Sequence, residues 1–189
     1  MLAGYKMTAA DKDQKFAVGP ATSYPGHQTN EKVTIGVQAF VSDEDTKPAF
    51  GKNNPYKYGV LPVLMVIQNN SDKAIHIEEL EAQYIPPGGG RVEATPAQDV
   101  RYLSAPGKPK MIPGPTGTPK VLKRKNPLGS WEIEGRGFSA KMIPPGEAAS
   151  GFVYFQTGFQ RSSKIYLSGL KEAGSNRELF YFEIPLAER

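Results

Sequence analysis

Two apolar runs that lie far apart in the sequence constrain this chain more than any other feature. The first extends from Val60 to Ile67 and the second from Phe152 to Phe155. Consecutive residues in both runs are apolar, which is typical of strands that are covered on both faces. We therefore expect the two runs to lie side by side at the centre of the fold. Because Pro62 has no N–H to donate to a ladder, we expect pairing from Val63 onward.

Other segments also read as strands. Residues 33–41 alternate between apolar and polar side chains, which predicts a half-buried antiparallel strand. The turn-forming residues 69–72 predict a hairpin between strands 60–68 and 73–84. The apolar positions change phase within the second of these strands, and this change predicts a β-bulge near Glu78 and Glu79.

The remaining chain predicts more short strands and one short helix. Trp131 and Ile133 are expected on one face of a strand, whereas residues 42–57 are expected to form a long loop. Thr95-Pro96 followed by Gln98 resembles a helix start, so the helix is predicted over Pro96–Leu103. About seven or eight strands separated by turns predict an all-β protein, an antiparallel β-sandwich.

The chain of 189 residues fits a single domain with an additional arm. Residues 1–30 are polar and contain turn-forming pairs, so we expect an extended N-terminal arm, with the sandwich domain over residues 31–189. No stretch approaches the roughly 18 apolar residues of a membrane span, and we expect no transmembrane segment.

The net charge of +4 is concentrated in one loop rich in Pro and Gly, residues 105–129, which we call the basic loop. It contains six cationic residues and no acidic ones, so the rest of the chain carries about −2 (4 minus 6). Its prolines predict an irregular conformation. The expected contact residues are these cations and the tryptophan that follows: Lys108, Lys110, Lys120, Lys123, Arg124, Lys125 and Trp131.

Residues that could support catalysis or bind metal are sparse. The chain has no Cys and only two histidines, His27 and His76, which lie far apart in the sequence. We therefore expect no catalytic residues, metal site or cofactor. The acidic run Asp43–Asp45 is interpreted as a solvated turn rather than a Ca²⁺ loop, because EF-hand spacing is absent. Glu132 and Glu134 are interpreted as surface residues rather than a glycosidase pair.

The order of motifs resembles a known kind of domain. Residues 66–75 end a strand in Asn-Asn-Ser-Asp, and residues 144–155 place a Pro-Pro-Gly-Glu turn before Gly-Phe-Val-Tyr-Phe. This order, over about residues 33–185, resembles the immunoglobulin-like sandwich domains of bacterial exported proteins and lipoproteins. The resemblance implies an immunoglobulin-like fold and an extracytoplasmic location, and it supplies no catalytic residues. A cytoplasmic location stays the alternative.

We expect a non-enzymatic interaction module that binds another protein or a cell-envelope component through the basic loop. The loop has no aromatic residue between Ala105 and Trp131 for base stacking, so we expect no nucleic-acid binding. One alternative is an assembly protein that pairs through an edge strand or the arm. Another is a carbohydrate- or cation-binding domain that uses residues 42–57. An exposed strip of Tyr154, Tyr166 and Tyr181 is a further candidate contact face.

Overall fold

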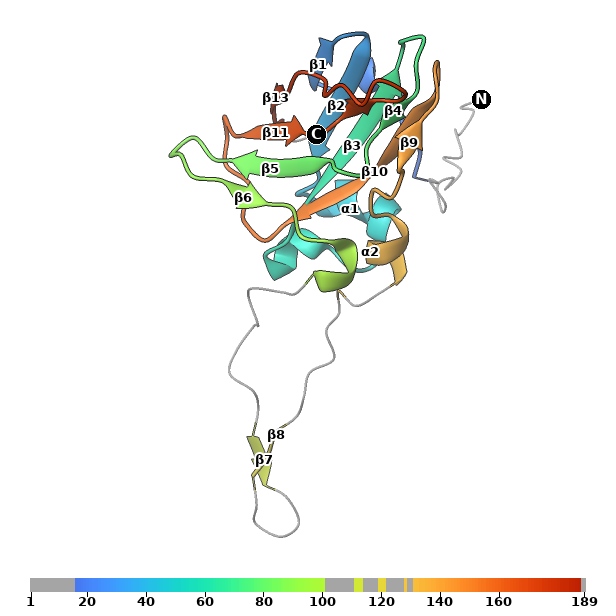
Figure 1. The fold of residues 1–189 in the computed structure, drawn as a ribbon. Helices are drawn as coiled ribbons and strands as arrows, with labels where there is room; N and C mark the ends of the chain where they lie inside the picture. Colours follow the sequence, from blue (N-terminus) through green and yellow to red (C-terminus); the bar gives the residue numbers. More distant parts are fainter. Residues whose placement is uncertain (1–15, 101–110, 114–118, 122–127, 129–130, 188–189) are drawn as a thin grey trace, which may run out of the picture.

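The computed structural model describes residues 16–100, 111–113, 119–121, 128 and 131–187, and it has three layers (Figure 1). The middle layer is a four-stranded antiparallel sheet with the strand order β1-β2-β3-β10. Its strands are β1 (Gly26–Asn30), β2 (Val33–Ala39), β3 (Leu61–Asn69) and β10 (Ala148–Phe155). The coarse prediction of a mostly β, antiparallel protein is therefore confirmed.

The two apolar runs pair as predicted. β3 and β10 form an antiparallel ladder from Leu61↔Phe155 to Gln68↔Ala148. Pairing begins two residues before the predicted Val63, so that detail of the prediction was wrong. Pro62 is tolerated because it lies beyond the last pair of the β2 ladder, Ala39↔Val63, where its carbonyl still accepts a 3.0 Å bond from the Phe40 N–H.

The second layer covers one face of the central sheet. One part is a sheet in the order β13-β11-β5-β6, and the other is a small sheet in the order β12-β4-β9. The core between this layer and the central sheet is mostly aliphatic. The strands are β4 (Ile75–His76), β5 (Glu81–Ile85), β6 (Val92–Glu93), β9 (Met142–Ile143), β11 (Lys164–Ser168), β12 (Lys171–Glu172) and β13 (Phe182–Pro185).

Helices and irregular segments cover the other face, and the core there is rich in aromatic residues. Phe152 lies at its centre, with ring centroids 4.7 Å from Phe50, 5.0 Å from Phe40 and 5.5 Å from Phe16. The helices are η1 (Ala21–Ser23), α1 (Asp43–Phe50), η2 (Pro55–Tyr58), η3 (Ala97–Asp99) and α2 (Trp131–Gly135).

Several local predictions were wrong at this helical layer. The expected loop 42–57 contains α1, which begins where the Ser42 side chain accepts a bond from the Asp45 N–H and three acidic residues favour the first turn. The helix predicted over Pro96–Leu103 is only the 3-10 turn η3, with residues 101–103 outside the described part. Trp131 and Ile133 lie on α2, not on a strand. The one predicted helix was therefore misplaced.

The predicted hairpin after β3 was also wrong, because the chain crosses to the other layer instead of folding back. β3 pairs with β2 and β10, and β4 pairs with β9 and β12. The fully buried Asn69 stabilises this crossing, since its amide donates to the carbonyls of Lys73, Ile143 and Pro144 at 2.7–3.1 Å. There is no β-bulge between β4 and β5: the phase change marks a turn between two different sheets.

The N-terminal arm is docked from residue 16 onward, and residues 1–15 lie outside the described part. β1 adds an edge strand to the central sheet, and η1 crosses β2 so closely that a Cβ on Gly36 would lie 2.3 Å from the Ala21 carbonyl oxygen. Every residue of β2 is therefore buried, whereas we had predicted a half-buried strand. The alternation itself is confirmed, because the apolar positions face the aliphatic core.

β1 also joins the two sheets at one side of the molecule. Gln28 accepts a 2.9 Å bond from the Glu183 N–H, and the Asn30 amide donates a 2.9 Å bond to the Tyr181 carbonyl. Glu31 accepts from the Phe180 N–H at 3.2 Å. Side chains of the β1 edge thus bond to the backbone beside β13, and we call these three contacts the lateral bonds.

The basic loop contains one regular element among its described residues. β7 (Met111–Pro113) and β8 (Pro119–Val121) form a short antiparallel ladder, with Ile112 opposite Lys120. The prediction of an irregular loop was therefore wrong for these six residues. Pro113 and Pro119 pair with each other at the end of the ladder next to residues 114–118, and proline is tolerated there because both strands are edge strands.

Candidate functional site

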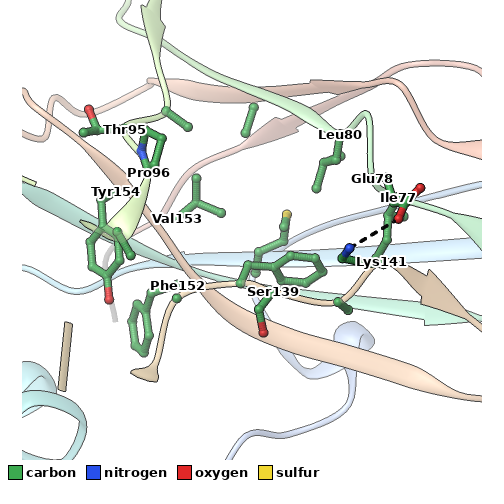
Figure 2. A pocket seen from close by; sticks show the side chains of 17 residues that line it. Ile77, Glu78, Leu80, Thr95, Pro96, Ser139, Lys141, Phe152, Val153 and Tyr154 are labelled. Atoms are coloured by element: carbon green, nitrogen blue, oxygen red, sulfur yellow. Dashed lines mark ion pairs between the residues drawn. The ribbon is translucent and has the colours of Figure 1, made fainter. Parts of the chain in front are cut away.

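A cleft of about 500 Å³ opens beside β10 (Figure 2). In the central sheet, β10 is the edge strand opposite β1. The cleft lies between the two sheets. Its floor comes from residues of the central sheet, and its walls come from β5, from the segment after β6 and from residues 137–141. Its lining is mainly apolar: Met65, Ile77, Leu80, Ala82, Ala94, Phe138, Ala140 and Val153.

Backbone hydrogen bonds along the outer edge of β10 hold two walls of the cleft in place. Phe152 accepts a 2.9 Å bond from the Phe138 N–H and donates a 2.8 Å bond to the Arg136 carbonyl. The Tyr154 carbonyl accepts a 2.8 Å bond from the Thr95 N–H. Gly151 lets one wall approach, since a Cβ there would lie 2.5 Å from the Phe138 Cα.

The cleft is an opening in the aliphatic core rather than a separate cavity. Met65, Ile77 and Ala82 are buried core residues, whereas Leu80 and Val153 are only partly buried. At the rim, the Lys141 amine lies 3.7 Å from the Glu78 carboxylate (Figure 2). This pair is exposed, so it contributes little stability. The cleft therefore presents apolar surface that a ligand could cover.

The ionisable groups at the cleft are few. The ionisable side chains among its described lining are Glu78, Lys141 and Tyr154. The Tyr154 hydroxyl donates a 2.7 Å bond to the Ile133 carbonyl. Burial raises the pKa of Tyr154, and the nearby charge of Arg136 offsets part of that increase. The mainly apolar lining suits the binding of an apolar group.

Trp131 lies near this cleft and is 76% exposed. It begins α2, which contacts η3, and η3 begins at Ala97 in the cleft wall. Val100 lies just before the basic loop, and Leu128 lies at its end. Both are buried in the same aromatic core as Ile133 of α2. Both ends of the basic loop therefore lie at the helical layer, close to Trp131.

The structure locates only part of the predicted contact surface. Lys120 belongs to β8, and Trp131 begins α2. The other five cations lie outside the described residues: Lys108, Lys110, Lys123, Arg124 and Lys125. The cleft itself was missed from the sequence. Its one local signal in the sequence is the apolar pair Phe138 and Ala140, which precede β9.

Two of the predicted polar candidates, Asp43 and His27, have structural partners. Asp43 accepts bonds from Asn54 at 2.7 Å and from Lys57 at 2.5 Å. The bond from Asn54, followed by the bond from Lys57, lowers the pKa of Asp43. Glu132 and Glu134 are in the first turn of α2. His27 Nδ1 lies 2.7 Å from the Tyr24 carbonyl oxygen, and His76 is exposed on β4.

The described residues contain no group of three or more His, Cys, Asp or Glu side chains placed to hold a metal ion. A second hollow is lined by charged residues, four of which pair with one another. Arg177 lies 2.6 Å from Glu31 and 3.2 Å from Glu172, and Glu172 also pairs with Lys73. The bond from Lys73 is the main cause that lowers the pKa of Glu172. This cluster joins the β1–β2 turn to the loop before β13.

The predicted tyrosine strip was wrong for Tyr154, which is 1% exposed. Tyr166 and Tyr181 do lie together on the surface, with ring centroids 5.4 Å apart.

Among the described residues, no helix has the length and apolar character that crossing a membrane requires.

Comparisons with known proteins found similarity of shape alone. No protein-family model and no curated protein matches the chain. A functionally unknown protein from Listeria monocytogenes EGD-e is similar over 86% of this chain and 82% of its own, with 12% identity and a TM-score of 0.41. A Northeast Structural Genomics Consortium target is similar over 82% of this chain and 83% of its own, with 12% identity and a TM-score of 0.36.

Proposed function

We propose that this chain is a non-enzymatic binding module that acts outside the cytoplasm. Its contact surface is formed by Trp131 and the basic loop, and the cleft beside β10 receives an apolar group of the same partner. The extracytoplasmic location and the immunoglobulin-like class are part of this proposal. They rest on the resemblance of residues 66–75 and 144–155 to domains of exported proteins.

The exposure of Trp131 is the observation that carries the proposal. It is the chain's single tryptophan, and most of its surface faces solvent. Leaving so large an apolar side chain in water forgoes about 2 kcal/mol of burial. Tryptophan is enriched among the residues that dominate binding energy at interfaces. A partner that covers the indole would recover this stabilisation.

The charge of the basic loop indicates the kind of partner. Six cations without an acidic residue favour a surface that carries negative charge, and such attraction also accelerates association. The apolar cleft, whose wall includes Ala97 of η3 in contact with α2, adds a place for an aliphatic or aromatic side chain. An acidic protein, or an acidic component of the cell envelope, fits both features.

The test is capture of partners from a cell-envelope extract by the full chain. We expect one component to be retained by the wild type and lost after deletion of residues 107–126 or after Trp131→Ala. Met142→Ala is the matched control, because Met142 is 49% exposed but lies on β9. Unchanged retention by the deletion variant would refute the contact surface. Since Trp131 is the single indole, a blue shift of its emission with the purified component would confirm direct burial.

A further inference from the structure

The outer face of the β13-β11-β5-β6 sheet has a row of side chains across all four strands. The registers place Glu93 opposite Gln83, Gln83 opposite Tyr166, and Tyr166 opposite Glu183. Their neighbours along the strands, such as Tyr84 and Ile165, point into the core and are buried. This face is therefore separate from the cleft, which opens on the inner side of the same sheet.

Aromatic rings form a short stack on this face. Tyr166 and Tyr181 are stacked with an interplanar angle of 28° and a centroid distance of 5.4 Å. The Arg91 guanidinium lies 4.8 Å from the Tyr166 ring centroid. Tyr181 is still 54% exposed although Tyr166 covers one side of its ring. The far side of the Tyr181 ring is thus open to a ligand, and the adjacent Phe180 is 70% exposed.

Planar polar groups beside the stack are held in fixed orientations. Arg91 donates a 2.6 Å bond to the Gln83 side-chain oxygen, and the Gln83 amide donates a 2.7 Å bond to Glu93. On the other side of Tyr166, Lys164 lies 2.5 Å from Glu183. These groups retain further donor and acceptor positions toward solvent. Their four charges, two positive and two negative, cancel.

We propose that this face is a binding site for neutral carbohydrate chains. A pyranose ring has an apolar face of C–H groups and a rim of hydroxyls. The C–H face would pack on the open side of the Tyr181 ring, as apolar groups pack on aromatic rings in general. The hydroxyls would bond to the amide, carboxylate and guanidinium groups of Gln83, Glu93 and Arg91, which are already oriented, so little ordering is required.

The chemistry favours a sugar over a protein at this face. A protein that covered the row would remove two carboxylates and two cations from water, which is unfavourable unless each finds a partner. Sugar hydroxyls can replace the water molecules around these groups and leave them partly solvated. The balance of charge favours a neutral glycan over an acidic one.

The test uses native gels that contain one neutral polysaccharide each: hydroxyethyl cellulose, xylan, galactomannan or a soluble β-1,3-glucan. We expect at least one gel to retard the full chain, and titration calorimetry with the matching oligosaccharide to give its affinity. Tyr181→Ala should weaken that binding at least ten-fold, and Tyr181→Phe should preserve it. Circular dichroism spectra should be unchanged, since Tyr181 is exposed.

The Trp131→Ala variant should bind the polysaccharide as the wild type does. This control distinguishes failure of the carbohydrate proposal from failure of the proposed partner surface at Trp131. The inference is overturned if none of the four gels retards the wild type, or if Tyr181→Ala is retarded equally. It is also overturned if Tyr181→Ala converts a sedimenting dimer into a monomer without any polysaccharide effect, because the face would then join two copies of this chain.

Discussion

The two faces of the central sheet are filled and closed in different ways. Phe152 and Val153 are neighbours on β10 and point to opposite faces. Phe152 is 2% exposed among aromatic rings that come from three separate segments. Val153 lines the cleft and is only partly buried. Phe152 is thus enclosed by rings, whereas Val153 lies where the aliphatic face opens into the cleft.

The difference shows which elements close a core. The aliphatic face is covered by two small sheets, and side chains must fill the space between sheet layers. The aromatic face is covered by short helices and irregular segments, which bring Phe16 and Phe50 against Phe152. Truncating a side chain in an enclosed core leaves an empty cavity, whereas at an open site water can fill the space. Substitutions on the two faces should therefore differ in effect.

The largest effect is expected at Phe152. Phe152→Ala should lower the free energy of unfolding by about 3–5 kcal/mol, because the surrounding rings cannot fully collapse into the space. Urea denaturation followed by circular dichroism measures this loss. A loss below about 1 kcal/mol, the range of ordinary exposed sites, would show that the aromatic face is not tightly packed.

An intermediate effect is expected at Tyr154. Tyr154→Phe leaves the buried Ile133 carbonyl without its 2.7 Å bond and should remove about 1–2 kcal/mol of stability at pH 7. Denaturation of both proteins at one temperature measures the difference.

The pH dependence of this difference has a defined sign. Burial raises the pKa of Tyr154 above the value of about 10 in the unfolded chain. The neutral hydroxyl therefore contributes its full stability below pH 10, and this contribution declines as the pH rises further. The gap between wild type and Tyr154→Phe should narrow above pH 10. A gap that widens there would mean that Tyr154 ionises readily in the folded protein.

The smallest effect is expected at Val153. Val153→Ala removes two methyl groups from the floor of the open cleft, where water can enter, and should cost about 1 kcal/mol or less. The same urea experiment compares it with Phe152→Ala on the adjacent position. Equal losses for the two variants would remove the contrast between the faces.

The sequence predicted the centre of this fold better than its periphery. The β3–β10 pairing followed from two continuous apolar runs, because only a strand covered on both faces tolerates such composition. The helices were misplaced for a different reason. The acidic residues of Asp43–Asp45 were interpreted as a solvated turn, although after Ser42 they also suit a helix N-terminus. The hairpin after β3 failed because Asn69 bonds to a segment more than 70 residues away.

The candidate sites could be predicted only in part. Trp131 and the basic loop stand out by composition alone. The cleft depends on the spacing between two sheets and on the approach of residues 137–141 to β10, which no local pattern encodes. The stack of Arg91, Tyr166 and Tyr181 brings together residues from three separate segments of the chain. The sequence could therefore indicate the tyrosines but not their contact with one another or with Arg91.

The lateral bonds between the β1 edge and the backbone beside β13 determine how the layers can move. They tie the sheets at one border with three bonds. At the opposite border the Thr95 N–H bonds to the Tyr154 carbonyl of β10, and the cleft separates the sheets beside this bond. Thermal breathing would then resemble rotation about a hinge, with amplitude growing toward the cleft. Ligands larger than the resting gap could enter there without unfolding the tied side, and amide protons in β1 should exchange more slowly than those near Phe138.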